Sequence, residues 1–201
     1  MNIFLALSRL IDRVNELIGK GVVWAILLAV LVSTINAVIR KLFSVSSNAW
    51  LEMQWYLFGA AFMCAAAWTL KLGEHVRIDV LYARWSRKAQ HRIDLFGHVV
   101  FLLPFVVLMS WYLWPWAMRS ACIGGNEFCR IEMSTNSGGL PTWPAKFLLL
   151  IGFIQMSFQA VSEIIKKIAI MRGLIEDPTP FSSASQAAEQ EAEALIREMQ
   201  K

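Results

Sequence analysis

The chain has 201 residues, of which 57% are hydrophobic and only 17% are charged, and its mean hydropathy is +0.49. The apolar residues gather in long charge-free blocks, which argues against a soluble domain because too little polar chain remains to cover them. The net charge of +4 and the isoelectric point near 9.1 suit anionic lipid headgroups, so they give no reason to expect nucleic acid as a partner.

The first predicted element is an amphipathic helix over residues 1–20. Apolar residues recur there at helical spacing, and charged residues occupy the opposite face. The apolar set is Ile3, Leu7, Leu10, Ile11, Val14, Leu17 and Ile18, and the charged set is Arg9, Asp12, Arg13 and Glu16. This pattern predicts a helix that lies on the cytoplasmic surface of the membrane.

Four largely charge-free blocks follow. About 20 apolar residues in a helix cross a hydrocarbon core of ~30 Å, and in lipid only a helix satisfies the backbone of a single segment. The predicted transmembrane spans are about 21–39, 51–70, 95–118 and 146–165. The first span lacks a signal-peptide cleavage site at its end, so we expect it to be retained. Residues 21–172 are therefore expected to form a four-helix membrane domain, and the predicted fold class is an all-α membrane protein.

Lysine and arginine counts predict the orientation. The N-terminal segment, the second loop and the C-terminal segment together hold 14 of the 19 basic residues, and the first and third loops hold the other 5. The positive-inside rule then places both termini and the second loop in the cytoplasm.

The second loop predicts another amphipathic interfacial helix, between spans 2 and 3. Its apolar face is Ile78, Leu81, Tyr82 and Trp85, and its polar face is Arg84, Arg87, Lys88 and His91. A solvated connector is the alternative. The last segment, residues 173–201, is rich in Ser, Ala, Gln and Glu, and we expect a mobile cytoplasmic tail because it has too few apolar residues to form a core.

Two cysteines, Cys122 and Cys129, lie in the third loop, on the predicted periplasmic side. That compartment permits a structural disulfide. The alternative is a redox pair in a four-helix membrane enzyme, but such enzymes need a second, more reactive cysteine pair, which the chain lacks. A haem would need axial ligands within the bilayer, and only His98 approaches a span. We therefore expect no catalytic residue, no metal and no cofactor.

The second span carries small residues that let another helix approach closely: Gly59, Ala61 and Ala65. The partner is either a helix of the same chain or one of another protein. Glu52 stands at the start of this span, where a carboxylate suits a helix N-terminus. Three neutral polar residues in the spans, Asn36, Gln155 and Gln159, are candidates for hydrogen bonds between helices.

Residues 52–82 read EMQWYLFGAAFMCAAAWTLKLGEHVRIDVLY, and residues 134–146 read STNSGGLPTWPAK. The first stretch resembles the small, DctQ-type membrane subunit of tripartite ATP-independent periplasmic (TRAP) transporters, with a Phe-Gly-Ala-Ala core at 58–61 and a Glu-His-Val-Arg-Ile-Asp motif at 74–79. The second stretch is similar to the Gly-Gly-Leu-Pro segment of longer members. The resemblance covers roughly residues 10–175.

This resemblance implies a non-enzymatic subunit of the bacterial inner membrane, bound to a large multi-span permease subunit. A periplasmic substrate-binding protein would deliver an organic acid, and a sodium gradient would drive its uptake. The candidate contacts with the partner or with membrane phospholipids are Glu52, Gly59, Ala61, Ala65, His75, Arg77, Asp79, Gly138, Gly139, Leu140 and Pro141. For the last four residues, a turn that only sets the topology is the alternative.

Overall fold

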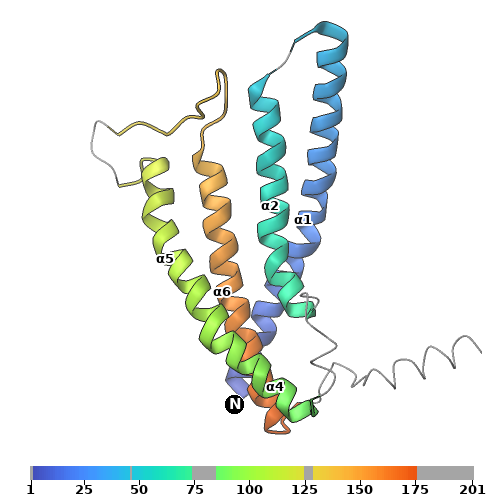
Figure 1. The fold of residues 1–201 in the computed structure, drawn as a ribbon, viewed down its shortest axis with the longest axis vertical. Helices are drawn as coiled ribbons and strands as arrows, with labels where there is room; N and C mark the ends of the chain where they lie inside the picture. Colours follow the sequence, from blue (N-terminus) through green and yellow to red (C-terminus); the bar gives the residue numbers. More distant parts are fainter. Residues whose placement is uncertain (1, 46, 74–84, 125–128, 176–201) are drawn as a thin grey trace, which may run out of the picture.

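The computed structural model describes residues 2–45, 47–73, 85–124 and 129–175, and these are almost entirely helical (Figure 1). The helices are α1 (Asn2–Phe43), α2 (Asn48–Leu72), α4 (Arg87–Gly97), the π-helical turn η1 (His98–Leu102), α5 (Leu103–Ser120) and α6 (Trp143–Met171). Helices α4, η1 and α5 follow one another without a break. By length and composition, four helical stretches of the described residues suit a membrane span, in agreement with the predicted all-α class and its four spans.

Helix α1 runs without interruption from the N-terminal segment through the first predicted span. Its 42 residues correspond to about 63 Å, twice the thickness of a hydrocarbon core. The described residues therefore show no separate surface helix over 1–20. Ile3 and Leu17 of the apolar stripe are 82% and 76% exposed, so this stripe is open to lipid or to a partner. Ser8 and Asn15, on another side of the helix, are buried against α6.

The second predicted interfacial helix falls largely on residues 74–84, which lie outside the described part of the chain. The described part begins again at Trp85, which is exposed, and continues as α4. His91 was placed on the polar face of that helix, but its side chain is buried. The described residues thus show the end of this loop as the start of the helix that leads into α5.

Helix α6 is the centre of the arrangement. It packs against α1, α2 and α5, and α2 also packs along α1 (Figure 1). Of the residues in its most apolar stretch, 39% are buried, compared with 6% for the α4–α5 stretch. The apolar contact between α5 and α6 is formed around Leu113, Ala117 and Leu150. Since so little of α5 is buried, most of its apolar surface is available to lipid or to another protein.

Two glycines allow the helices to approach closely. A Cβ atom on Gly152 of α6 would lie 2.8 Å from Cβ and 3.2 Å from the carbonyl oxygen of Met63 on α2. A Cβ atom on Gly19 of α1 would lie 2.7 Å from the indole ring of Trp68 on α2. Contacts of this kind bring helix backbones together in membranes, where dispersion and hydrogen bonding replace the hydrophobic effect between helices.

The segment between α5 and α6, which we call loop 121–142, contains a short hairpin in its described residues 129–142. Met133 and Pro141 form an antiparallel bridge, and the amide of Ser134 donates to the carbonyl of Leu140. Gly138 turns the chain with a φ of 69°, a conformation that favours glycine. This agrees with the predicted Gly-Gly-Leu-Pro turn and leads into α6.

Candidate partner interface

The side chain of Glu52 anchors loop 121–142 to the first turns of α2. Its carboxylate is 5% exposed and accepts hydrogen bonds from the Ser134 hydroxyl, from Nδ2 of Asn136 (2.9 Å) and from the Leu140 amide (2.6 Å). Gly139 allows the loop to approach Glu52 this closely, because a Cβ atom at residue 139 would lie only 2.8 Å from Oε1 of Glu52. Glu52, Gly139 and Leu140 were predicted as partner contacts, and the structure brings them together within the chain.

Two further hydrogen bonds join the same elements. The Tyr56 hydroxyl donates to the carbonyl of Pro141 (3.0 Å), and Nδ2 of Asn48 donates to the carbonyl of Ser137 (2.9 Å). All these donors and acceptors are on α2 or in loop 121–142. The loop therefore fixes α2 relative to the start of α6, which follows it directly.

A second group of contacts ties the loop to α5 and α6. Glu132 pairs with Lys146, whose ammonium also lies 4.3 Å from the centre of the Trp116 ring. The hydroxyls of Ser120 and Thr142 are 3.1 Å apart. The hydrogen bond from Lys146, followed by that from Ser120, holds the pKa of Glu132 below its ordinary value. Cys122 and Cys129 are joined by a disulfide in this loop, with their Cα atoms 5.7 Å apart.

The opposite end of the molecule holds a polar cluster between α1 and α6, which we call the α1–α6 cluster: Ser8, Asp12, Asn15, Gln159, Ser162, Glu163 and Lys166. Asp12 lies at its centre. Its carboxylate accepts from Gln159 (2.9 Å), from Ser162 (2.9 Å) and from Lys166 (3.1 Å). Buried polar groups are stable only when paired, so this set fixes one register between the two helices.

Two more ion pairs attach neighbouring helices at the same end. Lys71 at the end of α2 lies 2.7 Å from Glu16 of α1, and Lys167 of α6 lies 2.7 Å from Asp94 of α4. Charged contacts thus join α1, α2, α4 and α6 at this end of the described part. Asp12, Glu16, Asp94 and Glu163 each accept from a lysine of the same chain, so these carboxylates already have a cationic partner.

The small residues of α2 do not share one environment. Ala61 is 4% exposed and Ala65 is half-buried, so Ala61 serves packing inside the chain. Gly59 is different, because a Cβ there would meet no atom within 4 Å. Gly59 therefore borders open space, whereas Ala61 is enclosed. Gln155 and Gln159 also bond within the chain, to the carbonyl of Cys64 and to the α1–α6 cluster.

Three predicted interface residues, His75, Arg77 and Asp79, lie outside the described residues. Gly138 and Pro141 lie in the hairpin turn described above. His98 begins the π-helical turn η1, beside a cleft that also borders Asp94 and Met156. Within the described ranges, no group of three or more histidine, cysteine, aspartate or glutamate side chains is arranged to hold a metal ion.

Sequence patterns named Gln159 as a candidate for a hydrogen bond between helices, but they did not assemble the α1–α6 cluster around Asp12 and did not single out Gly19 or Gly152. The clue for the cluster was present, because Asp12 and Lys166 are charged residues next to apolar spans, and such residues are rare unless paired. For the glycines there was no clue, since nothing in a sequence says which residue a glycine will meet.

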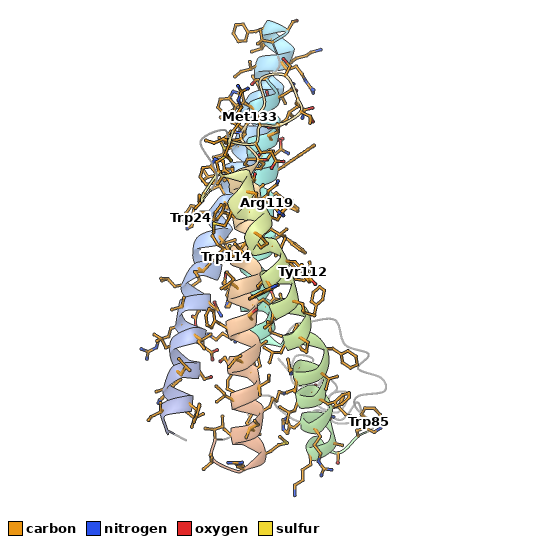
Figure 2. The ribbon with its side chains drawn as sticks, turned by 90° about the vertical axis from the view of Figure 1, so that its left-hand side faces the viewer. Trp24, Trp85, Tyr112, Trp114, Arg119 and Met133 are labelled. Atoms are coloured by element: carbon orange, nitrogen blue, oxygen red, sulfur yellow. A yellow bond between two sulfur atoms is a disulfide. The ribbon has the colours of Figure 1, made fainter. Side chains whose placement is uncertain are left out.

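The outer surface of the described helices is strongly apolar. Figure 2 shows the side chains that project from the helices, among them Trp24 of α1 and Tyr112 of α5, which are 67% and 69% exposed. Among the grooves in the described part of this surface are one of about 520 Å³ between α1 and α2 and one of about 680 Å³ between α5 and α6. Apolar surface of this extent is typical of a protein that contacts lipid or another membrane protein.

Taken together, four apolar spans with polar contacts turned inward define a multi-pass α-helical membrane protein. Residues 29–169 match the model of a family described as tripartite ATP-independent periplasmic transporters, DctQ component. The chain therefore belongs to the DctQ family, whose members are non-enzymatic components of TRAP transporters. This confirms the resemblance drawn from residues 52–82 and 134–146 and overturns the alternative of a redox enzyme. Comparison with curated proteins and with solved structures gave no significant match.

Proposed function

We propose that this chain is the small membrane subunit of a sodium-coupled TRAP transporter that takes up an organic acid. In this role it braces a large multi-span permease subunit and carries no substrate site itself. A periplasmic binding protein delivers the substrate to the complex. The chain lies in the bacterial inner membrane with both termini in the cytoplasm, as the distribution of its basic residues favours.

The observation that carries the bracing role is the pairing of the acidic side chains in the described helices. Asp12, Glu16, Glu52, Asp94 and Glu163 all accept hydrogen bonds from donors of the same chain. An ion or carboxylate pathway needs charged or polar groups that are available at membrane depth. Here these groups are used to hold helices together, which suits a rigid brace better than a conduit.

The test is purification of the tagged chain in mild detergent from cells that produce the whole transporter. We expect a much larger multi-span protein to be recovered with it. Uptake of labelled organic acids should require both proteins and should fall when sodium is replaced by choline. A chain that is recovered alone, or uptake that is unchanged in cells lacking it, would contradict the proposal.

The orientation has its own test. Reporter fusions that are active only in the periplasm should give signal when placed in loop 121–142 and none at either terminus. Signal from a terminal fusion would refute the proposed topology without affecting the family assignment.

A further inference from the structure

The groove between α1 and α2 differs chemically from the rest of the membrane-facing surface. Its lining includes Ser33, Thr34, Gln54, Trp55, Phe58 and Gly59, and it encloses about 520 Å³. It therefore combines polar side chains with aromatic rings and an open glycine. This groove is large enough for several side chains of a neighbouring helix.

The amide of Gln54 has no hydrogen-bond partner among the described residues, and neither has the hydroxyl of Ser33, whereas Thr34 donates to the carbonyl of Val30 (2.8 Å). Gln54 lies in the second turn of α2, within the predicted span 51–70. An amide within a membrane span is costly to leave unpaired, because lipid acyl chains have no group that can form a hydrogen bond with it. The occupant should therefore carry hydrogen-bonding groups.

The geometry around Gly59 points to a helix rather than to a single polar molecule. There is space above its Cα, so a neighbouring backbone can approach closely. Trp55 and Phe58, 68% and 63% exposed, stand beside it and offer a large apolar contact area.

The groove between α5 and α6 provides the comparison. It is larger, about 680 Å³, and is lined mainly by apolar residues such as Trp111, Trp114 and Phe158. Its two serines, Ser110 and Ser157, donate to carbonyls of their own helices, at 2.7 and 2.8 Å. Its other polar atoms in the described lining are the indole N–H groups of Trp111 and Trp114, and it holds no amide or hydroxyl side chain without a partner, so lipid chains suit it better than they suit the α1–α2 groove.

We infer that the α1–α2 groove is the docking site for a transmembrane helix of the large permease subunit, which presents a hydrogen-bonding side chain to Gln54 and a small-residue surface to Gly59. This inference rests on the proposed function and specifies which face of the subunit serves it. The α5–α6 groove is then the lipid-facing side.

A photo-crosslinking amino acid, benzoylphenylalanine, tests this in the intact complex. It is introduced at Trp55 in one variant and at Trp111 in the other, where both side chains are large, aromatic and exposed. Irradiation of membranes should join the Trp55 variant to the large subunit and should give only lipid adducts with the Trp111 variant. The reverse pattern, or crosslinks to the large subunit from Trp111 alone, would overturn the inference.

Substitutions provide the second measurement. Gln54→Leu removes the amide, and Gly59→Leu fills space that is empty in the chain itself, so each should leave the subunit folded. We expect each to lower the recovery of the large subunit about three- to tenfold, as for the loss of one hydrogen bond or close contact between membrane helices. Ser110→Leu, the matched control in the other groove, should leave recovery unchanged.

The outcomes separate the inference from the proposed function. If the unchanged chain recovers the large subunit and the Gln54 and Gly59 variants recover as much, the docking site is wrong and the proposed function stands. If the unchanged chain recovers no large subunit, both fail. The level of each variant in the membrane, measured by its tag, shows whether a loss of recovery reflects a loss of the subunit itself.

Discussion

The close contact at Gly152 predicts that replacing this residue with alanine loosens α2 from α6. The new Cβ would lie 2.8 Å from Cβ of Met63, whereas carbon atoms in contact lie about 3.5–4.0 Å apart. The atoms in the way include the root of a side chain and a backbone carbonyl, which cannot rotate aside. The two helices must therefore separate locally by about 1 Å.

The expected cost follows from two opposing effects. Overpacking costs about 1–3 kcal/mol, and alanine returns up to about 1 kcal/mol through its better helix propensity. The separation also stretches the hydrogen bond from Gln155 to the carbonyl of Cys64, 3.2 Å long and three residues away along α6. Such a bond contributes about 0.6 kcal/mol in membrane proteins. We expect a net loss of roughly 1–2 kcal/mol in the free energy of unfolding.

Thermal unfolding of the purified chain in detergent measures this loss. Cys64 is the free cysteine and is buried, since Cys122 and Cys129 are bonded to each other. A dye that fluoresces on reaction with thiols therefore reports when the α2–α6 contact opens. Gly152→Ala should lower the midpoint by several degrees.

Gly59→Ala is the matched control, because its Cβ meets no atom within 4 Å on the same bundle. This variant should unfold at the unchanged temperature or slightly above it. If Gly152→Ala unfolds no earlier than Gly59→Ala, the close approach of α2 and α6 at Met63 is not as the structure places it.

Three further predictions concern loop 121–142 and the Glu-His-Val-Arg-Ile-Asp motif at residues 74–79. Glu52→Gln removes the negative charge of the carboxylate that accepts the hydrogen bond from the Leu140 amide. Hydrogen exchange over residues 134–141 should therefore accelerate, and unchanged exchange would contradict the anchoring role of Glu52. Because the pKa of Glu132 is lowered from about 4.5, its pairing with Lys146 contributes above that pH and is lost as the pH falls through the lowered value. The difference in unfolding temperature between the unchanged chain and Glu132→Gln should therefore be present at pH 7 and should vanish in strong acid; a difference that grows in acid would refute the pairing. Arg77→Glu should weaken recovery of the large subunit, and unchanged recovery and uptake would reject a role for this motif in assembly.

The sequence predicted the helical class and the four spans correctly because both depend on local properties. A block of about 20 apolar residues must be helical in lipid, whatever it packs against. The predicted spans 51–70 and 146–165 lie inside α2 and α6, and the helices extend beyond them by only a few residues. The turn at Gly138 was also predictable, since glycine favours its backbone conformation.

The faces of the helices were not predictable in the same way. The pattern at residues 3–18 placed Asp12 on the charged face of a helix at the membrane surface and named no partner for it. In the structure Asp12 faces Ser162 and Lys166 of α6, 150 and 154 residues away in the chain. Amphipathic spacing shows that a helix has two faces, but it does not show which face meets lipid and which meets another helix.

The same limit applies to the candidate interface. The sequence by itself determined the apolar spans, the cysteine pair of the third loop and the family, since these depend on composition, spacing and motif. Only the tertiary structure decided that Glu52 binds loop 121–142, that Ala61 is enclosed and that Gly59 borders open space. The reason is physical: residues of similar size and polarity become internal or external according to which distant helix lies beside them, and that is a property of the packed chain.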